Sequence, residues 1–154
     1  MKLMKGILWC AFILYLACLS KIILIKHLPI SIILQNLDVR LNLNQSNFVP
    51  FATITDYFAL GYTWISIENI IGNIIIFVPL GLLLPILIGK FRKDIIALLL
   101  VSFIISFIFE LVQLLFPIFG SFDVDDLLLN ILGALIGYFA FRLSRKLYRN
   151  EYFN

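Results

Sequence analysis

Four long runs of hydrophobic residues, separated by shorter polar segments, dominate the chain. They cover about residues 7–25, 69–88, 95–116 and 126–143. Each run is close to the roughly 20 apolar residues that an α-helix needs to cross the hydrocarbon core of a bilayer. The pattern predicts an all-α polytopic membrane protein, in which residues 1–154 form a single domain built on a four-helix transmembrane bundle.

Residues 26–68 form the longest connector and separate the first predicted helix from the second. This connector is too long for a simple turn, and it is too short and too apolar for a separate soluble domain. We therefore expect it to lie on the membrane surface. The segment Thr53–Asp56 resembles a capping box ahead of Tyr57, which predicts a short interfacial helix there.

Composition supports the membrane assignment, because 62% of the residues are hydrophobic and only 14% are charged. Soluble domains have about 45–50% apolar and about 25% charged residues, so a soluble globular class is excluded. The first run, with Lys2 and Lys5 ahead of it, also resembles a secretory signal peptide. It is long for a signal peptide and no small-x-small site follows it, so we expect an uncleaved first helix.

Most basic residues belong to three segments: the N-terminus, the connector between the second and third helices, and the C-terminal tail. Nine of the twelve fall there, namely Lys2, Lys5, Lys90, Arg92, Lys93, Arg142, Arg145, Lys146 and Arg149. The positive-inside rule then predicts a multi-pass protein of the cell membrane with both termini in the cytoplasm. The basic residues form no continuous stripe, so we expect no nucleic-acid partner. The expected partners are membrane lipids, with the basic tail touching anionic ones.

The third predicted helix carries one polar stripe. Ser102, Ser106, Glu110 and Gln113 are spaced by four, four and three residues, which places them on one face of an otherwise apolar helix. A carboxylate at membrane depth costs about 2.5–3.5 kcal/mol on insertion scales, and such residues usually mark a function. The alternative is that Glu110 only stabilises the bundle through an interhelical hydrogen bond.

The second and fourth helices have a similar design. Asn69 and Asn73 share one face near the start of the second helix, and Asp126 and Asn130 share one face near the start of the fourth. Because the three sets lie at similar depths, we expect them to converge on one pocket at the outer end of the bundle. The candidate ligand-binding residues are Asn69, Asn73, Gln113 and Asn130.

Three acids precede or open the fourth helix. Asp123, Asp125 and Asp126 could hold a hard divalent cation through oxygen ligands, or they could simply cap the helix. A divalent cation is therefore a possible cofactor, whose identity the sequence leaves unknown. His27 is the only histidine, which argues against zinc sites and histidine-based catalytic triads.

The order of these motifs resembles the VanZ-like family. The resemblance rests on Asn47-Phe-Val-Pro-Phe51, Asn73-Ile-Ile-Ile-Phe-Val-Pro-Leu-Gly81, Ser106-Phe-Ile-Phe-Glu-Leu-Val-Gln113 and Phe122-Asp-Val-Asp-Asp-Leu-Leu-Leu-Asn-Ile-Leu-Gly133 with Gly137. The family often has an arginine shortly before the acidic cluster, where this chain has Gly120 and Ser121. The resemblance implies a small integral membrane protein of the bacterial envelope, in a family named after a member linked to low-level teicoplanin resistance.

Two functions remain open at this point. In the first, an acidic outer-leaflet pocket binds or modifies a lipid-linked envelope precursor or a lipoglycopeptide, with Glu110 and Asp126 as the candidate catalytic residues. In the second, the polar stripes are structural and the protein is a non-catalytic subunit that docks into a larger membrane assembly through Gly133 and Gly137. Transport is the weakest option, and the oligomeric state is unknown.

Overall fold

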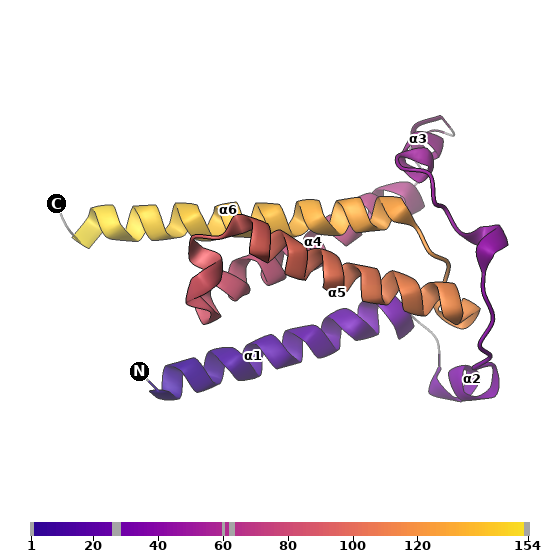
Figure 1. Ribbon diagram of the computed structural model, residues 1–154, viewed down its shortest axis with the longest axis horizontal. Helices are drawn as coiled ribbons and strands as arrows, with labels where there is room; N and C mark the ends of the chain where they lie inside the picture. Colours follow the sequence, from indigo (N-terminus) through magenta and orange to yellow (C-terminus); the bar gives the residue numbers. More distant parts are fainter. Residues whose placement is uncertain (1, 26–28, 60, 62–63, 153–154) are drawn as a thin grey trace.

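The computed structural model describes residues 2–25, 29–59, 61 and 64–152. Four of its helices are long and apolar enough to cross a membrane, and Figure 1 shows them packed side by side. These helices are α1 (Lys2–Ser20), which a π-helical turn η1 (Lys21–Ile25) extends, α4 (Trp64–Leu87), α5 (Ile95–Leu115) and α6 (Val124–Tyr152). The predicted all-α architecture with four spans is confirmed.

Three of the four long helices extend beyond the predicted runs, and the first of them, α1, begins at Lys2 rather than near Ile7. Helix α4 begins at Trp64 rather than near Asn69, because the segment Trp64–Glu68 contains neither Gly nor Pro and continues the helix towards its N-terminus. Helix α6 continues past residue 143 to Tyr152. The basic tail contains neither Gly nor Pro, and its Arg, Lys and Leu residues favour helix, so nothing in it ends the helix. Pro79 and Pro85 lie inside α4, which runs through both.

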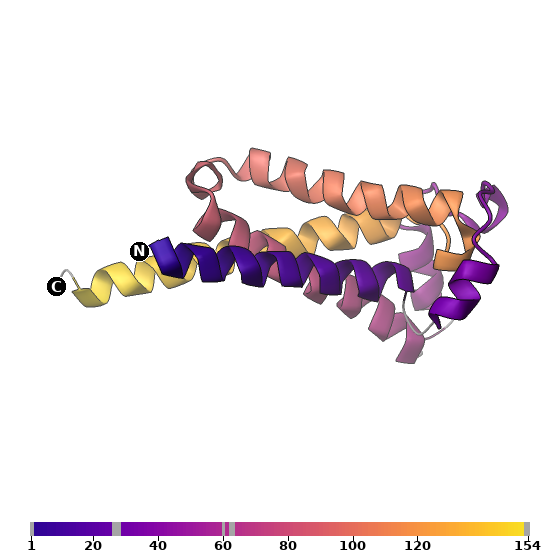
Figure 2. The same ribbon diagram turned by 90° about the horizontal axis from the view of Figure 1, so that it is seen from below.

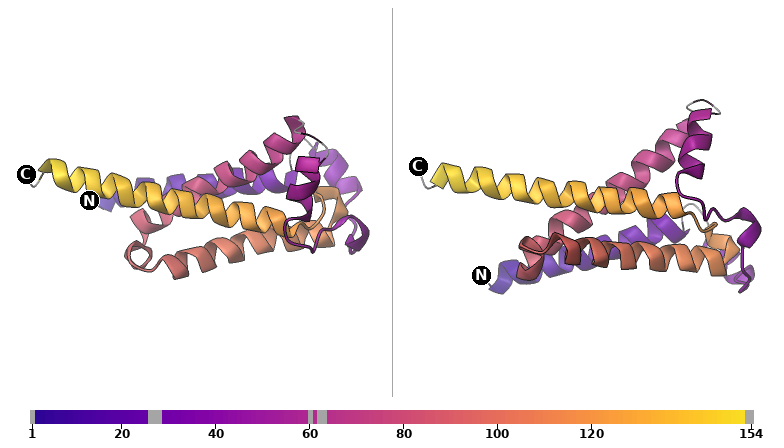
Figure 3. Two further views of the ribbon diagram at one scale, coloured as in Figure 1. Left: turned by 90° about the horizontal axis from the view of Figure 1, so that it is seen from above. Right: turned by 45° about the horizontal axis from the view of Figure 1, so that its top comes forward.

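Helices α4 and α6 make the closest contact in the bundle and cross obliquely (Figure 3). Three glycines allow this approach. A Cβ added to Gly81 would lie 1.8 Å from the carbonyl oxygen of Ala134. A Cβ added to Gly133 would lie 2.1 Å from the carbonyl oxygen of Ile74, and one added to Gly137 would lie 2.0 Å from that of Val78. Small residues permit backbones to approach in lipid, where helix association depends on close packing.

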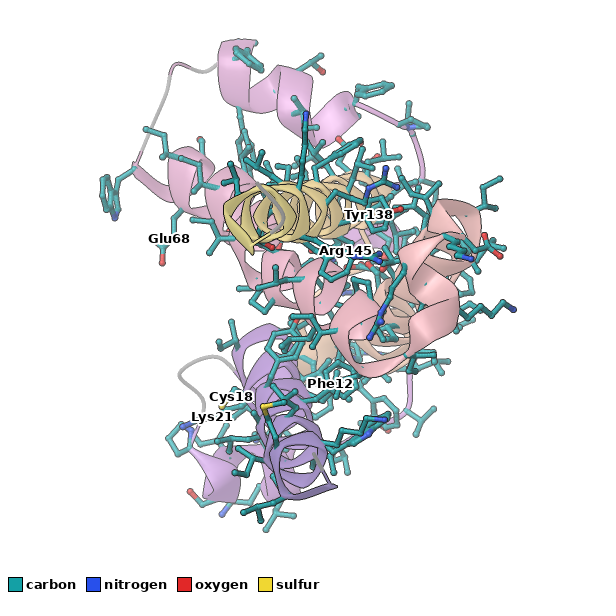
Figure 4. The ribbon with its side chains drawn as sticks, turned by 90° about the vertical axis from the view of Figure 1, so that its left-hand side faces the viewer. Phe12, Cys18, Lys21, Glu68, Tyr138 and Arg145 are labelled. Carbon is teal, nitrogen blue, oxygen red and sulfur yellow. The ribbon has the colours of Figure 1, made fainter. Side chains whose placement is uncertain are left out.

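Helix α1 lies at the edge of the bundle. In the end-on view of Figure 4, Phe12 points from α1 towards the other helices, and the residue is only 7% exposed. Leu19 is likewise buried, and the Tyr15 hydroxyl donates to the Ile76 carbonyl oxygen of α4 at 2.7 Å. Most other α1 side chains are exposed, as expected for a helix surrounded largely by lipid.

The two chain ends lie at one end of the bundle, and the long connector covers the other end (Figures 1 and 2). Three short helices belong to this connector: α2 (Ile30–Gln35), the 3-10 turn η2 (Leu43–Gln45) and α3 (Ala52–Ala59). The short helix predicted ahead of the second span is therefore present as α3. The only histidine, His27, falls outside the described residues.

The connector is hydrogen-bonded to the turn between α5 and α6. The backbone N–H groups of Arg40 and Asn42 donate to the carbonyls of Leu115 and Leu114, which the last turn of α5 leaves without helical partners. Asn47 then pairs with the backbone on both sides of Asp123. The connector thereby closes this end of the bundle and fixes the start of α6.

The opposite end has a tight hairpin, η3 (Gly89–Arg92), between α4 and α5. The Arg92 guanidinium donates to the Pro85 and Ile86 carbonyl oxygens at 2.8 and 3.1 Å, which satisfies the last turn of α4. The Asp94 carboxylate accepts from the Ala97 N–H at 2.9 Å and caps α5. These local contacts hold the two helices antiparallel.

Candidate functional site

A cavity of about 540 Å³ lies between η1, α4, α5 and α6 near the connector end of the bundle. Its lining contains Ile22, Ile23, Glu68, Asn69, Gly72, Asn73, Ile76, Glu110, Gln113, Asp126 and Asn130. All four predicted ligand-binding residues and both candidate catalytic residues are among them. The polar stripes of the second, third and fourth spans therefore meet at one place.

Helical spacing explains how each helix contributes. Positions 69, 72, 73 and 76 lie on one face of α4, positions 110 and 113 on one face of α5, and positions 126 and 130 on one face of α6. The whole predicted stripe of α5 is buried: Ser102, Ser106, Glu110 and Gln113 are all among the buried polar residues. Glu68 lies at the rim, and Figure 4 shows its side chain at the outside of α4.

Glu110 is the most buried acid that lines the cavity, with 2% of its surface exposed. Its Oε2 accepts a hydrogen bond from the backbone N–H of Asp123 at 2.8 Å. This contact ties the C-terminal part of α5 to the start of α6. Glu110 therefore makes the predicted kind of structural hydrogen bond and also lines the cavity.

Two amide side chains have unused acceptors at the cavity. Gln113 donates from Nε2 to the carbonyl oxygens of Ile23 and Phe119 at 3.4 and 3.3 Å, and Asn130 donates from Nδ2 to Ser106 Oγ at 2.8 Å. Gln113 Oε1 and Asn130 Oδ1 are buried and have no hydrogen-bond partner among the described residues. Buried polar atoms are normally paired, so each such atom calls for an explanation.

The three aspartates do not form the predicted metal site. Across the residues that the structure describes, no group of three His, Cys, Asp or Glu side chains is placed to hold a metal ion. Asp123 instead caps α6, because its Oδ1 accepts from the Asp125 N–H at 2.8 Å. Asp126 alone of the three lines the cavity. The capping alternative is therefore correct for Asp123.

Asp125 anchors the connector. It is fully buried, and its carboxylate accepts from the backbone N–H groups of Phe51 and Ile54 at the start of α3. Phe51 has a φ of 69°, in the left-handed region that non-glycine residues rarely adopt. The carboxylate of α6 thus caps α3 from a distant part of the chain and fixes an unusual backbone turn.

The predicted capping box of α3 is also wrong, because aspartates near the start of α6 bind the first turn of α3. Thr53 lies inside α3, and its hydroxyl donates to Asp123 Oδ2 at 2.7 Å rather than capping its own helix. At the other end of α3, the Tyr57 hydroxyl accepts from the Asn69 Nδ2 of α4 at 2.7 Å. Helix α3 is therefore held at both ends by residues next to the cavity.

Sequence reasoning missed the apolar wall of the cavity. Ile22 and Ile23 belong to η1, whose π-helical turn has no simple sequence signal, and π-helical turns often occur at functional sites. Gly72 and Ile76 share the α4 face with Asn69 and could have been found from that spacing. An added Cβ at Gly72 would meet no atom within 4 Å, so this glycine leaves open space.

The structure also removes the docking surface expected for a non-catalytic subunit. Gly133 and Gly137 are buried against α4 within the same chain, where a Cβ added at either position would clash with the backbone of Ile74 or Val78. The small-residue seam is therefore already occupied. It stabilises the cavity walls formed by α4 and α6, and it is not open to a partner.

Comparison with known proteins agrees with the motifs. The family model described as VanZ/LLP1 matches residues 12–145, which include most of all four long helices. Protein VanZ of Enterococcus faecium is 36% identical over 84 residues, which cover 53% of this chain and 48% of that protein. The chain thus spans about half the length of this relative. No solved structure matches the chain.

Proposed function

Because this chain belongs to the VanZ/LLP1 family, we propose that it is a cell-envelope protein whose cavity binds the polar part of a lipid-linked envelope precursor or a lipoglycopeptide. Through this binding it lowers the action of teicoplanin at the cell surface. The family and the four long apolar helices make the chain a multi-pass membrane protein. Ligand binding and resistance are the proposal.

The observation that carries this proposal is the convergence of polar side chains from three helices on one cavity. Membrane-spanning helices have few polar residues, and such residues usually face a protein interior or a water-filled space that serves a function. Here carboxylates and carboxamides of α4, α5 and α6 line the same space. Hydrogen bonds that only stabilise the bundle would not need a cavity of about 540 Å³ between them.

Binding is the part of the hypothesis that the geometry supports best. Modification of the ligand would use Glu110 and Asp126 as general acid and base, since both line the cavity. Asp123 and Asp125 are engaged in holding the connector, so we do not assign them a metal. The proposed roles are therefore ligand contact for Glu110 and Asp126, and positioning for Asp123 and Asp125.

A cavity-filling substitution tests the proposal. Gly72→Leu is expected to fit without a backbone clash, because the space beside Gly72 is open, and to occupy part of the cavity. In a teicoplanin-sensitive Gram-positive host, the strain that expresses Gly72→Leu should be as susceptible as the empty-vector strain. The measurement is the minimum inhibitory concentration of teicoplanin at matched membrane abundance.

Gly6→Leu is the matched control, since Gly6 also borders open space but lies on α1 far along the chain from the cavity residues. This variant should protect as well as the wild type. Equal protection by Gly72→Leu and Gly6→Leu would exclude the cavity as the origin of resistance. Failure of the wild type to protect would exclude the teicoplanin function itself.

For orientation, we propose that the end with the chain termini faces the cytoplasm and the cavity end faces outward. A surface cleft at the terminal end is lined by Arg92, Lys93, Arg142, Arg145 and Lys146, which agrees with the positive-inside rule. In a background without Cys10 and Cys18, an impermeant thiol reagent should label Asn44→Cys but not Lys90→Cys in intact cells. The reverse labelling would overturn this orientation.

A further inference from the structure

We infer that the ligand of this cavity is an amphiphile that carries a protonated amine. The inference rests on the proposed function, because it requires that the cavity binds a ligand. Charge, unused hydrogen-bond acceptors and the apolar wall each define one property of that ligand.

The charge of the lining favours a cation. Three carboxylates, those of Glu68, Glu110 and Asp126, line the cavity, and no Lys, Arg or His is among the described residues of its lining. At least Glu110 is buried almost completely. In a low-dielectric setting, a positively charged ligand is attracted to these carboxylates, whereas an anionic ligand would be repelled.

The unused acceptors favour a hydrogen-bond donor. The exposed fractions of Gln113 and Asn130 are 5% and 3%, and the Oε1 and Oδ1 atoms of these residues have no partner in the described part of the chain. The Gln113 amide cannot be turned round without loss, because its Nε2 faces two carbonyl oxygens, which only accept. A protonated primary amine has three donors and no acceptor, so it suits these oxygens and the carboxylates.

The arrangement favours an amine over a metal ion. Ca²⁺ needs six to eight oxygen ligands around one point, and no three acids of the described residues are grouped in that way. An extended ligand does not need such convergence, because different donor groups along it can reach different side chains. Amine and hydroxyl or amide N–H groups of one polar head could therefore reach both the Gln113 and the Asn130 oxygen.

The apolar part of the lining favours an attached apolar chain. Ile22, Ile23 and Ile76 line the cavity on the side of η1 and α4. Helix α1, which precedes η1, has many exposed apolar side chains and makes far less contact with the bundle than α6 does. A ligand with a polar amine head and an apolar tail would match both kinds of lining.

Purified wild-type protein in nanodiscs of zwitterionic phosphatidylcholine can test this inference with three probes. These are the dodecyl amide of lysine, the same molecule with both amines acetylated, and lysine methyl amide, which lacks the tail. Binding is measured as the rise in melting temperature with probe concentration. We expect the amine amphiphile to bind at least about tenfold more tightly than the acetylated one, a difference typical of a hydrogen bond to a charged group.

Variants show whether this preference arises in the cavity. Gly72→Leu should abolish the stabilisation, Glu110→Gln should reduce the preference for the amine about tenfold, and Gly6→Leu should behave as the wild type. If both dodecyl probes bound equally to the wild type and neither bound to Gly72→Leu, the cavity would be a ligand site but the amine inference would be overturned.

The remaining outcomes are also decisive. If lysine methyl amide bound as tightly as the dodecyl amide, the apolar tail would not contribute to binding. The inference of an amphiphile would then be overturned, and the ligand would be a soluble amine. Equal stabilisation of the wild type and Gly72→Leu would show binding outside the cavity and would overturn the inference. Absence of binding by all three probes would overturn it too, whereas the teicoplanin susceptibility of Gly72→Leu decides the proposed function separately.

Discussion

Alanine at both Gly133 and Gly137 is expected to remove most of the folded protein from the membrane. The added methyl carbons would lie 2.1 and 2.0 Å from the carbonyl oxygens of Ile74 and Val78. These are backbone atoms, which cannot rotate away as a side chain can, so α4 and α6 must separate. Overpacking costs about 1–3 kcal/mol per site, and two such sites consume much of a typical stability of about 5–15 kcal/mol.

The melting temperature of the purified protein and its abundance in membranes measure this effect. Gly6→Ala is the control, because its added methyl group would meet no atom within 4 Å. It should melt at or slightly above the wild-type temperature, since alanine favours helix more than glycine does. A double variant that melted within a few degrees of Gly6→Ala would contradict the close contact between α4 and α6.

Glutamine in place of Glu110 is expected to preserve the fold and to abolish protection against teicoplanin. The Oε1 of glutamine can still accept the hydrogen bond that Glu110 receives from the Asp123 N–H at 2.8 Å, so the link between α5 and α6 survives. The substitution removes only the charge and adds an amide donor. Stability should stay equal or rise, because a neutral amide is cheaper than a carboxylate inside a membrane.

Teicoplanin susceptibility at matched membrane abundance measures this second effect, with vancomycin as a reference antibiotic. Asp126→Asn should behave in the same way, since Asp126 lines the same cavity from α6. Asp94→Asn is the matched control, because Asp94 caps α5 at the opposite end of the bundle. Full protection by both Glu110→Gln and Asp126→Asn would show that these acids serve only the structure.

The spans and the converging polar stripes could be predicted because both depend on local spacing. Intervals of three and four residues place Glu110 and Gln113 on one face of α5, and Asp126 and Asn130 on one face of α6, whatever the rest of the chain does. An apolar helix in lipid must then turn such a face towards protein or a cavity. Helical spacing and the need to turn polar faces away from lipid were therefore enough to predict that the candidate residues lie close together.

The contacts of the acidic cluster could not be predicted, because its partners lie far away in the sequence. Asp125 accepts from Phe51 and Ile54, which are 74 and 71 residues away. Three neighbouring aspartates resemble a cation site when only their own segment is considered. The connector supplies the backbone N–H groups that Asp125 binds, and its sequence contains no motif that predicts this contact.

The glycine seam illustrates a different limit. The spacing of Gly133 and Gly137 predicts a close helix contact, but it does not say whether the partner helix belongs to the same chain. Gly81 of α4 faces Ala134 between them, which identifies the internal partner. The π-helical turn η1 could not be predicted either, because no particular residue type marks such a turn in a sequence.

Whether the cavity holds a ligand inside a cell membrane can be measured directly. Native mass spectrometry of the protein expressed in a Gram-positive host and released from its membranes, without added ligand, measures this occupancy. We expect a co-purified amphiphile, at up to one per chain, in the wild type and Gly6→Leu, and its loss in Gly72→Leu. The same bound mass at equal occupancy in all three proteins, or no bound mass in any of them, would contradict this expectation.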